Sequence, residues 1–268
     1  MKKRVILITG VSSGFGQATA FALLDRGCLV YGLSRSLPDE ALGKRLTGHF
    51  RADLCDEKAV KTAIRALIRQ AGRVDVVINN AGIGIGGSLE ETDDETMHRI
   101  FEVNFHGMCR VCRAVLPYMR KQGGGRILNV SSLGGRIGLP FQGAYSATKY
   151  AVEGYTEALY HEVKPFHIRV SLIEPGDFKT GFTAHRTHLS QKGSPYEAAG
   201  KRALSRIEKD EQNGSEPELF AETILRILSS KNPALRYRCG SLFQKLLTGL
   251  RPLMGERMFL FLLGKYYA

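Results

Sequence analysis

The stretch Thr9-Gly10-Val11-Ser12-Ser13-Gly14-Phe15-Gly16 decides the fold of this 268-residue chain. It ends the largely apolar run 4–9, and a pattern rich in Ala, Leu and Phe begins at Gln17. We therefore expect a strand, a tight turn and a helix in that order. Glycines at these positions let the backbone turn sharply and approach a pyrophosphate, while the start of the helix offers free N–H groups and a partial positive charge. The stretch predicts a turn that binds a dinucleotide.

Short β-branched runs alternate with longer helical patterns along most of the chain. Such strands, separated by amphipathic segments, predict a parallel sheet covered by helices on both faces, with the ligand site at the carboxyl ends of the strands. We expect an α/β fold, a Rossmann-like doubly wound parallel sheet in three α/β/α layers, as a single domain over residues 1–268. The predicted strands are 4–9, 29–33, 74–79, 126–131 and 168–174.

Two later segments depart from this alternation. Residues 181–217 are polar, rich in Ser, Gly and Lys and weakly periodic, so we expect a mobile insertion beside the substrate. Residues 240–268 form a basic and apolar tail, in which the run from Met258 to Leu263 would make every face of a helix apolar. Three interpretations of this tail stay open: burial within a subunit or an oligomer, a cover over the substrate cleft, and contact with an anionic membrane surface.

Composition narrows the class of protein. An apolar fraction of 43% over 268 residues supports a substantial buried core. No apolar stretch approaches the roughly 20 residues that span a bilayer. The five cysteines are scattered and odd in number, and the pair Cys109 and Cys112 lacks further ligands for zinc, so we expect neither disulfides nor a metal. These features predict a cytoplasmic protein, with the tail as its candidate contact to a membrane.

The net charge of +12 is concentrated near the C-terminus. Residues 231–268 contain seven Lys or Arg against one acid, Glu256, which accounts for +6 of the excess. Nucleic-acid binding would require a recognised fold or aromatic residues interleaved with the basic ones, and the sequence has neither. We therefore expect no nucleic-acid partner.

The glycine spacing G-x-x-x-G-x-G differs from the general dinucleotide fingerprint, and in this the chain resembles the one-domain branch of the short-chain dehydrogenase/reductase family. The resemblance covers residues 4–180 and implies a nicotinamide-dependent oxidoreductase. It also implies a homodimer or homotetramer that pairs through the helices before and after the Ser132 strand. The further motifs that carry it are Asn79-Asn80-Ala81-Gly82, Asn104, Asn129-Val130-Ser131-Ser132, Tyr145-Ser146-Ala147-Thr148-Lys149 and Pro175-Gly176.

The cofactor is expected to be NADP(H) rather than NAD(H). The second strand ends in Ser34 and Arg35, where an NAD enzyme would place an acid on the ribose hydroxyls. Arg35 offers a charge-assisted contact to a 2′-phosphate instead. By resemblance, Asp53 contacts the adenine and Thr180 the carboxamide. The cofactor residues expected are Gly10, Ser12, Ser13, Gly14, Phe15, Gly16, Ser34, Arg35, Asp53, Leu54, Asn80, Ala81, Gly82, Tyr145, Lys149, Pro175, Gly176, Phe178 and Thr180.

Tyr145 and Lys149 stand four residues apart at the start of a predicted helix, 143–165. At this spacing both side chains project from one face, so an ammonium group lies beside a phenol. Lowering the pKa of a tyrosine from ~10 to near neutrality needs about 4 kcal/mol of stabilisation of the phenolate. Two unit charges about 4 Å apart interact by ~4 kcal/mol at an effective dielectric constant of about 20. The pair therefore predicts a general acid-base residue with a pKa near the working pH.

Ser132 and Asn104 complete the expected catalytic group with Tyr145 and Lys149. Ser132 precedes Tyr145 by thirteen residues, where the family places the hydroxyl that binds the reacting oxygen. By resemblance, Asn104 holds a water that relays protons, and Lys149 also binds the nicotinamide ribose. In reduction, hydride passes from the nicotinamide to the carbonyl while Tyr145 protonates the developing alkoxide and Ser132 hydrogen-bonds it.

The substrate is expected to be a hydrophobic ketone, aldehyde or alcohol. The segment 132–141 is most similar to hydroxysteroid and retinol dehydrogenases, which implies a steroid-, retinoid- or lipid-like molecule. Phe141 and Phe182 are the expected walls of its cleft. Two alternatives remain at this point, namely a reductase of a small polar carbonyl and a catalytically silent protein that binds NADPH as a regulator.

Overall fold

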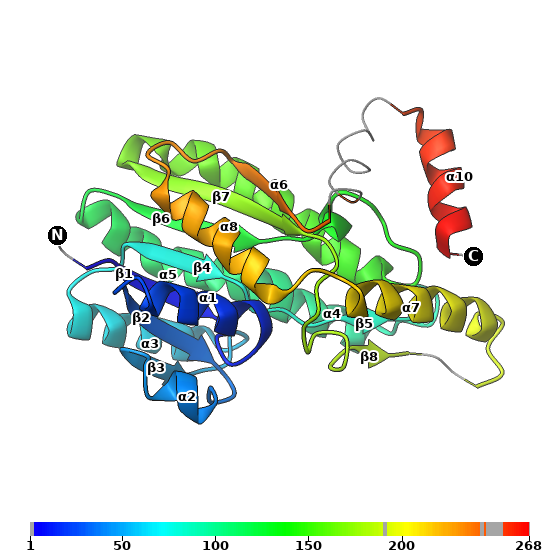
Figure 1. Cartoon of the computed structure of the whole chain (residues 1–268), viewed down its shortest axis with the longest axis horizontal. Coiled ribbons are helices and arrows are strands. Elements are labelled where there is room, and N and C mark those ends of the chain that lie inside the picture. Colours follow the sequence, from blue (N-terminus) through cyan, green and yellow to red (C-terminus); the bar gives the residue numbers. More distant parts are fainter. Residues whose placement is uncertain (1–2, 190–191, 242–243, 245–253, 268) are drawn as a thin grey trace.

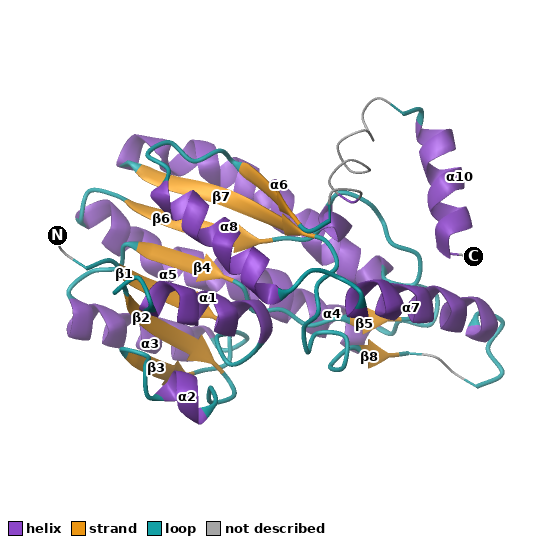
Figure 2. Cartoon of the chain, in the orientation of Figure 1, coloured by secondary structure: helices purple, strands orange, loops and turns teal. Residues whose placement is uncertain are grey.

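The computed structural model describes residues 3–189, 192–241, 244 and 254–267. Its centre is a seven-stranded parallel sheet in the order β3-β2-β1-β4-β6-β7-β9, with helices on both faces (Figure 2). This confirms the predicted Rossmann-like, doubly wound fold of three layers. The strands are β1 (Val5–Thr9), β2 (Leu29–Ser34), β3 (Gly48–Arg51), β4 (Val76–Asn79), β6 (Gly125–Val130), β7 (Ile168–Pro175) and β9 (Arg236–Cys239).

Alternate residues of the central strand β1 point to opposite faces of the sheet and belong to two separate hydrophobic cores. Val5 and Leu7 of β1 belong to a cluster with side chains of α3 (Glu57–Ala71), α5 (Gly107–Lys121) and α6 (Gly143–Val163). Ile6 and Ile8 belong to a second cluster with side chains of α1 (Gly14–Leu24) and α8 (Pro217–Ser229). All four strand residues are at most 2% exposed, as expected for a parallel sheet that is covered on both faces. The short helix α2 (Glu40–Gly43) lies beyond β2 and contacts α1.

The strand order reverses between β1 and β4. The chain runs outward from β1 through β2 to β3, and then returns to β4 before it continues through β6 and β7 to β9. At such a reversal the connections after two neighbouring strands leave in opposite directions, which opens a crevice at the carboxyl ends of the strands. The glycine-rich turn after β1 and the Asn80 segment after β4 both lie at this point.

A further group of elements lies beyond the carboxyl ends of the strands (Figure 1). The parallel pair of β5 (Ile85–Gly86) and β8 (Thr187–His188) joins two connections there. The other elements include α4 (Asp94–Phe101), the π-helix η1 (Glu102–His106), the 3₁₀-helix η2 (Leu133–Gly135), α7 (Glu197–Gln212) and α10 (Glu256–Tyr267). A second 3₁₀-helix, η3 (Lys164–Phe166), lies at the opposite end, just before β7. None of the described helices is long and apolar enough to cross a bilayer.

The five predicted strands are present within two residues at each end, but two edge strands were not predicted. β3 and β9 are four residues each and carry His or Arg, so neither shows the apolar run of a buried parallel strand. Tertiary contacts stabilise them instead. Arg236 of β9, for example, forms ion pairs with Glu153 of α6 at 2.9 Å and with Glu174 of β7 at 3.1 Å.

The segment 181–217 contains more regular structure than its sequence indicated, because helix α7 occupies sixteen of the residues for which we expected a mobile insertion. Helix α10 occupies the end of the tail 240–268, which we expected to be helical. Residues 190–191, 242–243, 245–253 and 268 lie outside the described residues, and with them the basic Lys245 and Arg251 of the tail.

The cysteine pair Cys109 and Cys112 lies in α5 and is buried in the core. The Cys112 sulfur accepts a hydrogen bond from Nδ2 of Asn79 at 3.3 Å. Burial raises the pKa of the Cys109 thiol to about 11 and that of Cys112 to about 12. Both therefore stay protonated and serve as packing groups.

Candidate active site

The turn after β1 places its glycines where larger residues would not fit. Gly10 and Gly14 have positive φ angles of 66° and 52°. A Cβ atom on Gly16 would lie 2.1 Å from the carbonyl oxygen of Gly10, so α1 begins directly against the turn. In the described structure, Ser13 at the N-terminus of α1 makes no side-chain capping hydrogen bond. The first N–H groups of the helix are thus available to bind an anion. This is the arrangement that a pyrophosphate site requires.

Thr9 and Asn80 tie this turn to the end of β4. The Thr9 hydroxyl accepts hydrogen bonds from the backbone N–H of Asn80 at 3.0 Å and of Ala81 at 3.1 Å. The Asn80 side chain donates to the carbonyl oxygens of Thr9 and Gly10, both at 3.1 Å. A Cβ atom on Gly10 would meet the Cα of Ala81 at 2.9 Å. These contacts fix both strand ends at the reversal of strand order.

Arg35 lies just after β2, at the rim of the same crevice. Its side chain is 57% exposed, and its Nη1 atom lies 4.0 Å from Oδ2 of Asp53. An ion pair so open to solvent contributes little, so the guanidinium group is free to bind a phosphate. The neighbouring Ser34 hydroxyl donates to the carbonyl oxygen of Ser36 at 2.8 Å. It is therefore already engaged within the protein.

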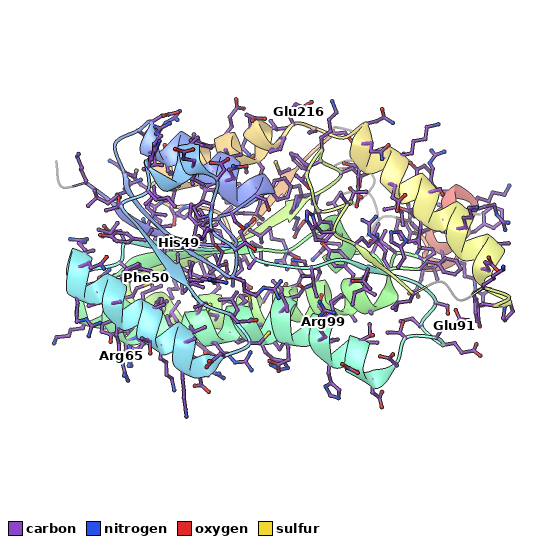
Figure 3. All side chains as sticks on the ribbon, turned by 90° about the horizontal axis from the view of Figure 1, so that it is seen from below. His49, Phe50, Arg65, Glu91, Arg99 and Glu216 are labelled. Atoms are coloured by element: carbon purple, nitrogen blue, oxygen red, sulfur yellow. The ribbon has the colours of Figure 1, made fainter. Side chains whose placement is uncertain are left out.

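Strand β3 adds two residues that sequence analysis missed, His49 and Arg51. Figure 3 shows His49 on this strand, where its Nε2 lies 2.8 Å from the Ser34 hydroxyl oxygen. Since the single hydroxyl proton goes to Ser36, His49 is the donor of this bond. Burial lowers the pKa of His49 and so favours the neutral form of the ring. Nε of Arg51 donates to the carbonyl oxygen of Arg35 at 3.1 Å, which places a second cation near the predicted phosphate site.

Tyr145 and Ser132 meet beyond the end of β6. The Ser132 hydroxyl accepts a hydrogen bond from the backbone N–H of Gly134 at 3.0 Å, which begins η2. Tyr145 lies in the first turn of α6, with its phenol beside the Ser132 hydroxyl. Burial raises the pKa of Tyr145 to about 12, and the interaction with the Ser132 hydroxyl opposes only part of the increase. The side chain is therefore a neutral phenol at neutral pH.

Lys149 lies one turn further along α6. Its Nζ atom is 5.7 Å from the centre of the Tyr145 ring and donates to the carbonyl oxygen of Val130 at 2.9 Å. Burial lowers the pKa of Lys149 to about 8, although the carboxylate of Glu153 opposes this. The tyrosine pKa near neutrality that we expected from the sequence is not present in this structure. Desolvation of the buried phenol outweighs the field of a lysine that is held by a backbone carbonyl.

Asn104 lies in the π-helix η1 and is 2% exposed. Its Oδ1 accepts a hydrogen bond from the backbone N–H of Ile83 at 2.8 Å, and its Nδ2 donates to the Ile83 carbonyl oxygen at 3.0 Å. Nδ2 also lies 3.2 Å from the Thr148 hydroxyl oxygen. π-Helical turns often occur at functional sites, and here the extra residue turns Asn104 toward the segment after β4. Asn104 thus joins that segment to α6.

The segment after β7 closes the far side of the crevice. Phe178 is 3% exposed, and its ring packs against Phe15 with centres 4.8 Å apart. A Cβ atom on Gly14 would lie 3.5 Å from Cβ of Thr180, so this segment faces the glycine turn directly. The predicted pyrophosphate turn and the predicted carboxamide contact are therefore neighbours.

A single cavity of about 1030 Å³ contains most of the predicted site. Its lining includes every residue that we predicted at the cofactor except Gly16, and also Ser132 and Phe182. The rings of Phe182 and Tyr145 lie 5.7 Å apart, so the predicted wall is beside the predicted acid. Asn104 lies behind the lining.

Phe141 lies apart from this cavity. It has a positive φ angle of 58° and lines a separate cavity of about 150 Å³ beneath α7. A Cβ atom on Gly200 would lie 3.2 Å from the Phe141 ring, so the ring is covered by that helix. The position of α7 decides this, and the sequence did not predict α7.

Three carboxylates that line the cavity were also missed, namely Asp177, Asp210 and Glu211. Burial raises the pKa of Asp177 to about 6, and the negative charges of Glu211 and Asp210 add to the effect. Asp210 accepts a hydrogen bond from the Tyr266 hydroxyl at 2.6 Å, and Glu211 pairs with the buried Arg186. Since Asp177 follows β7 and the other two carboxylates lie on α7, no local motif joins them.

Helix α10 supplies one wall of the cavity. Phe259 and Leu263 are 4% and 9% exposed and form a small apolar cluster with Ile137. The inner face of the helix thus covers the cavity, with α7 beside it (Figure 1). The residues of α10 in the lining are Phe259, Leu262, Leu263, Tyr266 and Tyr267.

Sequence comparisons relate the chain to known oxidoreductases. Residues 4–190 match the family model of short chain dehydrogenases. The chain is 45% identical to 3-ketodihydrosphingosine reductase of Bacteroides thetaiotaomicron, over 100% of this chain and 99% of that protein. It is 31% identical to retinol dehydrogenase 8 of Bos taurus, over 91% and 84% of the two chains.

Solved structures share the fold. A short-chain dehydrogenase from Streptomyces avermitilis has a TM-score of 0.84 at 32% identity and covers 94% and 93% of the two chains. A relative from Burkholderia phymatum in complex with NAD has a TM-score of 0.77 at 25% identity, with 88% and 89% covered. One from Burkholderia cenocepacia in complex with NADP has a TM-score of 0.73 at 26% identity, with 97% and 96% covered. These neighbours support a nicotinamide cofactor.

Proposed function

The chain belongs to the short-chain dehydrogenase/reductase family of oxidoreductases, and we propose that it reduces the ketone of a long-chain amino lipid with NADP(H). The observation that carries this proposal is the composition of the 1030 Å³ cavity. Tyr145 and Ser132 lie in it together with an apolar wall from α10 and the carboxylate of Asp177. These features match, in turn, a carbonyl, a hydrocarbon chain and a cationic amine. The similarity to a 3-ketodihydrosphingosine reductase supports the same substrate class, because that compound is a long-chain amino ketone.

Tyr145 is the proton donor in this proposal. With a pKa of about 12 it holds its proton at neutral pH, and in this proposal its hydroxyl and the neighbouring Ser132 hydroxyl both bind the carbonyl oxygen. A reduced nicotinamide, when bound, supplies the hydride that adds to the carbonyl carbon. The proton from Tyr145 then completes the alcohol. Lys149, on the same helix face, stabilises the phenolate that remains and holds the cofactor ribose.

Asn104 acts as a positioning residue in this proposal. Its side chain holds the backbone of Ile83, next to Gly82, and a Cβ atom on Gly82 would lie 3.3 Å from its Oδ1 and 3.8 Å from Nζ of Lys149. The amide thereby keeps the cofactor segment after β4 beside the lysine. A proton relay through a water at this residue remains the expectation that the family resemblance gives.

NADP(H) is proposed over NAD(H) because the rim after β2 is cationic. Arg35 stands where an acid would bind ribose hydroxyls, and Arg51 is hydrogen-bonded to its backbone. Asp53, at 4.0 Å from Arg35, is the carboxylate near this rim, and it also accepts a hydrogen bond from the backbone N–H of Cys55 at 2.9 Å. A 2′-phosphate would find two guanidinium groups here.

Asp177 is the proposed partner of the substrate amine. It follows the Pro175-Gly176 motif, and with a pKa of about 6 it is mostly ionised at neutral pH. An ammonium group would replace some of the solvation that burial removed from this carboxylate, so binding would lower its pKa again. A substrate with an amine next to the ketone would thus bind with the ketone toward Tyr145.

The test is a measurement of NADPH oxidation with three ketones. We expect turnover of 3-ketodihydrosphingosine, lower kcat/KM for the long-chain ketone without an amine, and the lowest for a short amino ketone. Turnover of small polar carbonyls alone would replace this proposal with a reductase of such compounds. Tight NADPH binding without turnover of any ketone would favour a silent regulator.

A further inference from the structure

Helix α10 is apolar on both its inner and its outer face. The inner face packs on Ile137 and covers the cavity, as described above. The outer face exposes Met258, Leu260 and Phe261, whose exposed fractions are 53%, 55% and 60%. A helix on the surface of a globular protein normally turns polar residues to solvent. In Figure 1 this helix stands at the periphery of the molecule, beside α7 and away from the sheet.

The apolar outer face is continuous with the lining of the cavity. Leu262 and Tyr266 line the cavity, yet they are 46% and 40% exposed. These two side chains therefore belong both to the cavity lining and to the exposed surface of α10.

The charges on this helix are mostly positive, with Arg257 and Lys265 against the single acid Glu256. Arg257 and Lys265 are exposed near the two ends of α10, and neither forms an ion pair among the described residues. Nζ of Lys265 lies 4.9 Å from the centre of the Phe261 ring, so cation and apolar face are adjacent. The segment 231–268 as a whole carries seven basic residues against one acid. A second copy of the chain in a two-fold contact would bring these cations against each other.

We propose that α10 docks on the surface of an anionic phospholipid bilayer and that the lipid substrate enters the cavity beside it. Met258, Leu260 and Phe261 insert among the lipid chains, while Arg257 and Lys265 bind the phosphates. The Tyr266 hydroxyl, bonded to Asp210 at 2.6 Å, and the Arg206 guanidinium, 4.4 Å from the Tyr266 ring, couple the docked helix to α7. The route for the substrate rests on the proposed function, whereas the docking itself does not.

The docking is tested by sedimentation of the full chain with vesicles. We expect binding to phosphatidylcholine vesicles that contain about 30% phosphatidylglycerol, and much weaker binding to phosphatidylcholine alone. Phe261→Ser should weaken binding roughly tenfold, because it removes one inserted aromatic side chain. Arg257→Gln with Lys265→Gln should weaken binding to a similar degree, roughly tenfold, and added salt should act in the same direction.

Matched controls come from η3, at the opposite end of the sheet. Phe166 is 42% exposed and Lys164 is exposed, so Phe166→Ser matches Phe261→Ser, and Lys164→Gln matches the Lys265→Gln half of the charge variant, both away from α10. Neither should alter vesicle binding. Equal binding of wild type and Phe261→Ser, with both proteins folded by circular dichroism, would overturn the proposal. So would a dimer in solution that Phe261→Ser dissociates, in the absence of vesicle binding.

A second measurement separates this inference from the proposed function. NADPH oxidation is followed with the amino ketone embedded in vesicles and with a water-soluble shorter homologue. Phe261 lies outside the cavity lining, so Phe261→Ser should slow only the reaction of the embedded substrate. Vesicle binding without reduction of either ketone would refute the proposed function and leave the docking intact. If the wild type and Phe261→Ser reduced the embedded substrate at equal rates, the route beside α10 would be refuted.

Discussion

The two halves of the large cavity are built in different ways. The cofactor half, between residues 9 and 180, consists of strand ends and turns fixed by hydrogen bonds to the backbone, such as those from the Asn80 side chain to the carbonyl oxygens of Thr9 and Gly10. The substrate half, between residues 182 and 267, consists of side chains from α7 and α10 that meet through rings and single polar contacts, such as Tyr266 with Asp210. Turns held by such contacts tolerate few amino-acid substitutions. A wall made of side chains changes its shape and polarity with each substitution. Under the proposed function, the catalytic residues are thus held by the scaffold of the fold, whereas substrate specificity depends on side chains that can be exchanged.

The largest effect is expected where the two halves meet, at Tyr145. Tyr145→Phe keeps the ring and removes the proton donor, so kcat should fall by roughly 10² to 10⁴-fold. NADPH affinity, measured by fluorescence titration, should change little. Phe182→Leu serves as the control, because it changes the adjacent cavity wall but removes no proton donor. Residual turnover near the wild-type rate would refute the assignment of Tyr145.

An intermediate effect is expected in the cofactor half. Arg35→Glu removes a charge-assisted contact to the 2′-phosphate and adds repulsion, so NADPH should bind roughly tenfold to 100-fold more weakly. NADH affinity should change far less, which the ratio of the two dissociation constants measures. Arg45→Glu, on the other side of α2, is the matched charge reversal. If Arg35→Glu weakened the binding of NADPH and NADH equally, Arg35 would not be the residue that recognises the 2′-phosphate.

The smallest effect is expected at Asp177, which lines the cavity where the cofactor half borders the substrate half. Its carboxylate has a pKa of about 6, so it is ionised above this pH and loses its charge as the pH falls through about 6. The KM of the amino ketone, divided by that of the ketone without an amine, should therefore rise roughly fivefold between pH 7.5 and pH 5. Titration of Lys149 near pH 8 affects both substrates alike and cancels in this ratio.

Asp177→Asn provides the sharper form of the same experiment. In this variant the ratio of the two KM values should be high at every pH, because the asparagine side chain is neutral throughout. A ratio that still follows pH in the variant would assign the effect to another group, such as Asp210 or Glu211.

Most of the cofactor half followed from the sequence because its signals are local. A glycine turn between a strand and a helix is recognised from a few consecutive residues, and so are polar residues at the ends of strands. Neither signal depends on how the rest of the chain packs. Within this half the sequence missed β3, whose four residues lack an apolar run, and with it His49 and Arg51. It also misjudged the Tyr145 pKa, since it counted the charge of Lys149 without the burial of the phenol.

By itself, then, the sequence determined the doubly wound sheet, the glycine turn after its first strand, and the candidate group of Ser132, Tyr145 and Lys149, which lines one cavity. Only the tertiary structure decided that Phe141 lies under α7, that Asp177 lines the cavity, and that α10 forms a wall of it. The reason is physical. Periodicity and turn chemistry act over a few residues, whereas these positions depend on packing between segments far apart in the chain, which no local pattern encodes.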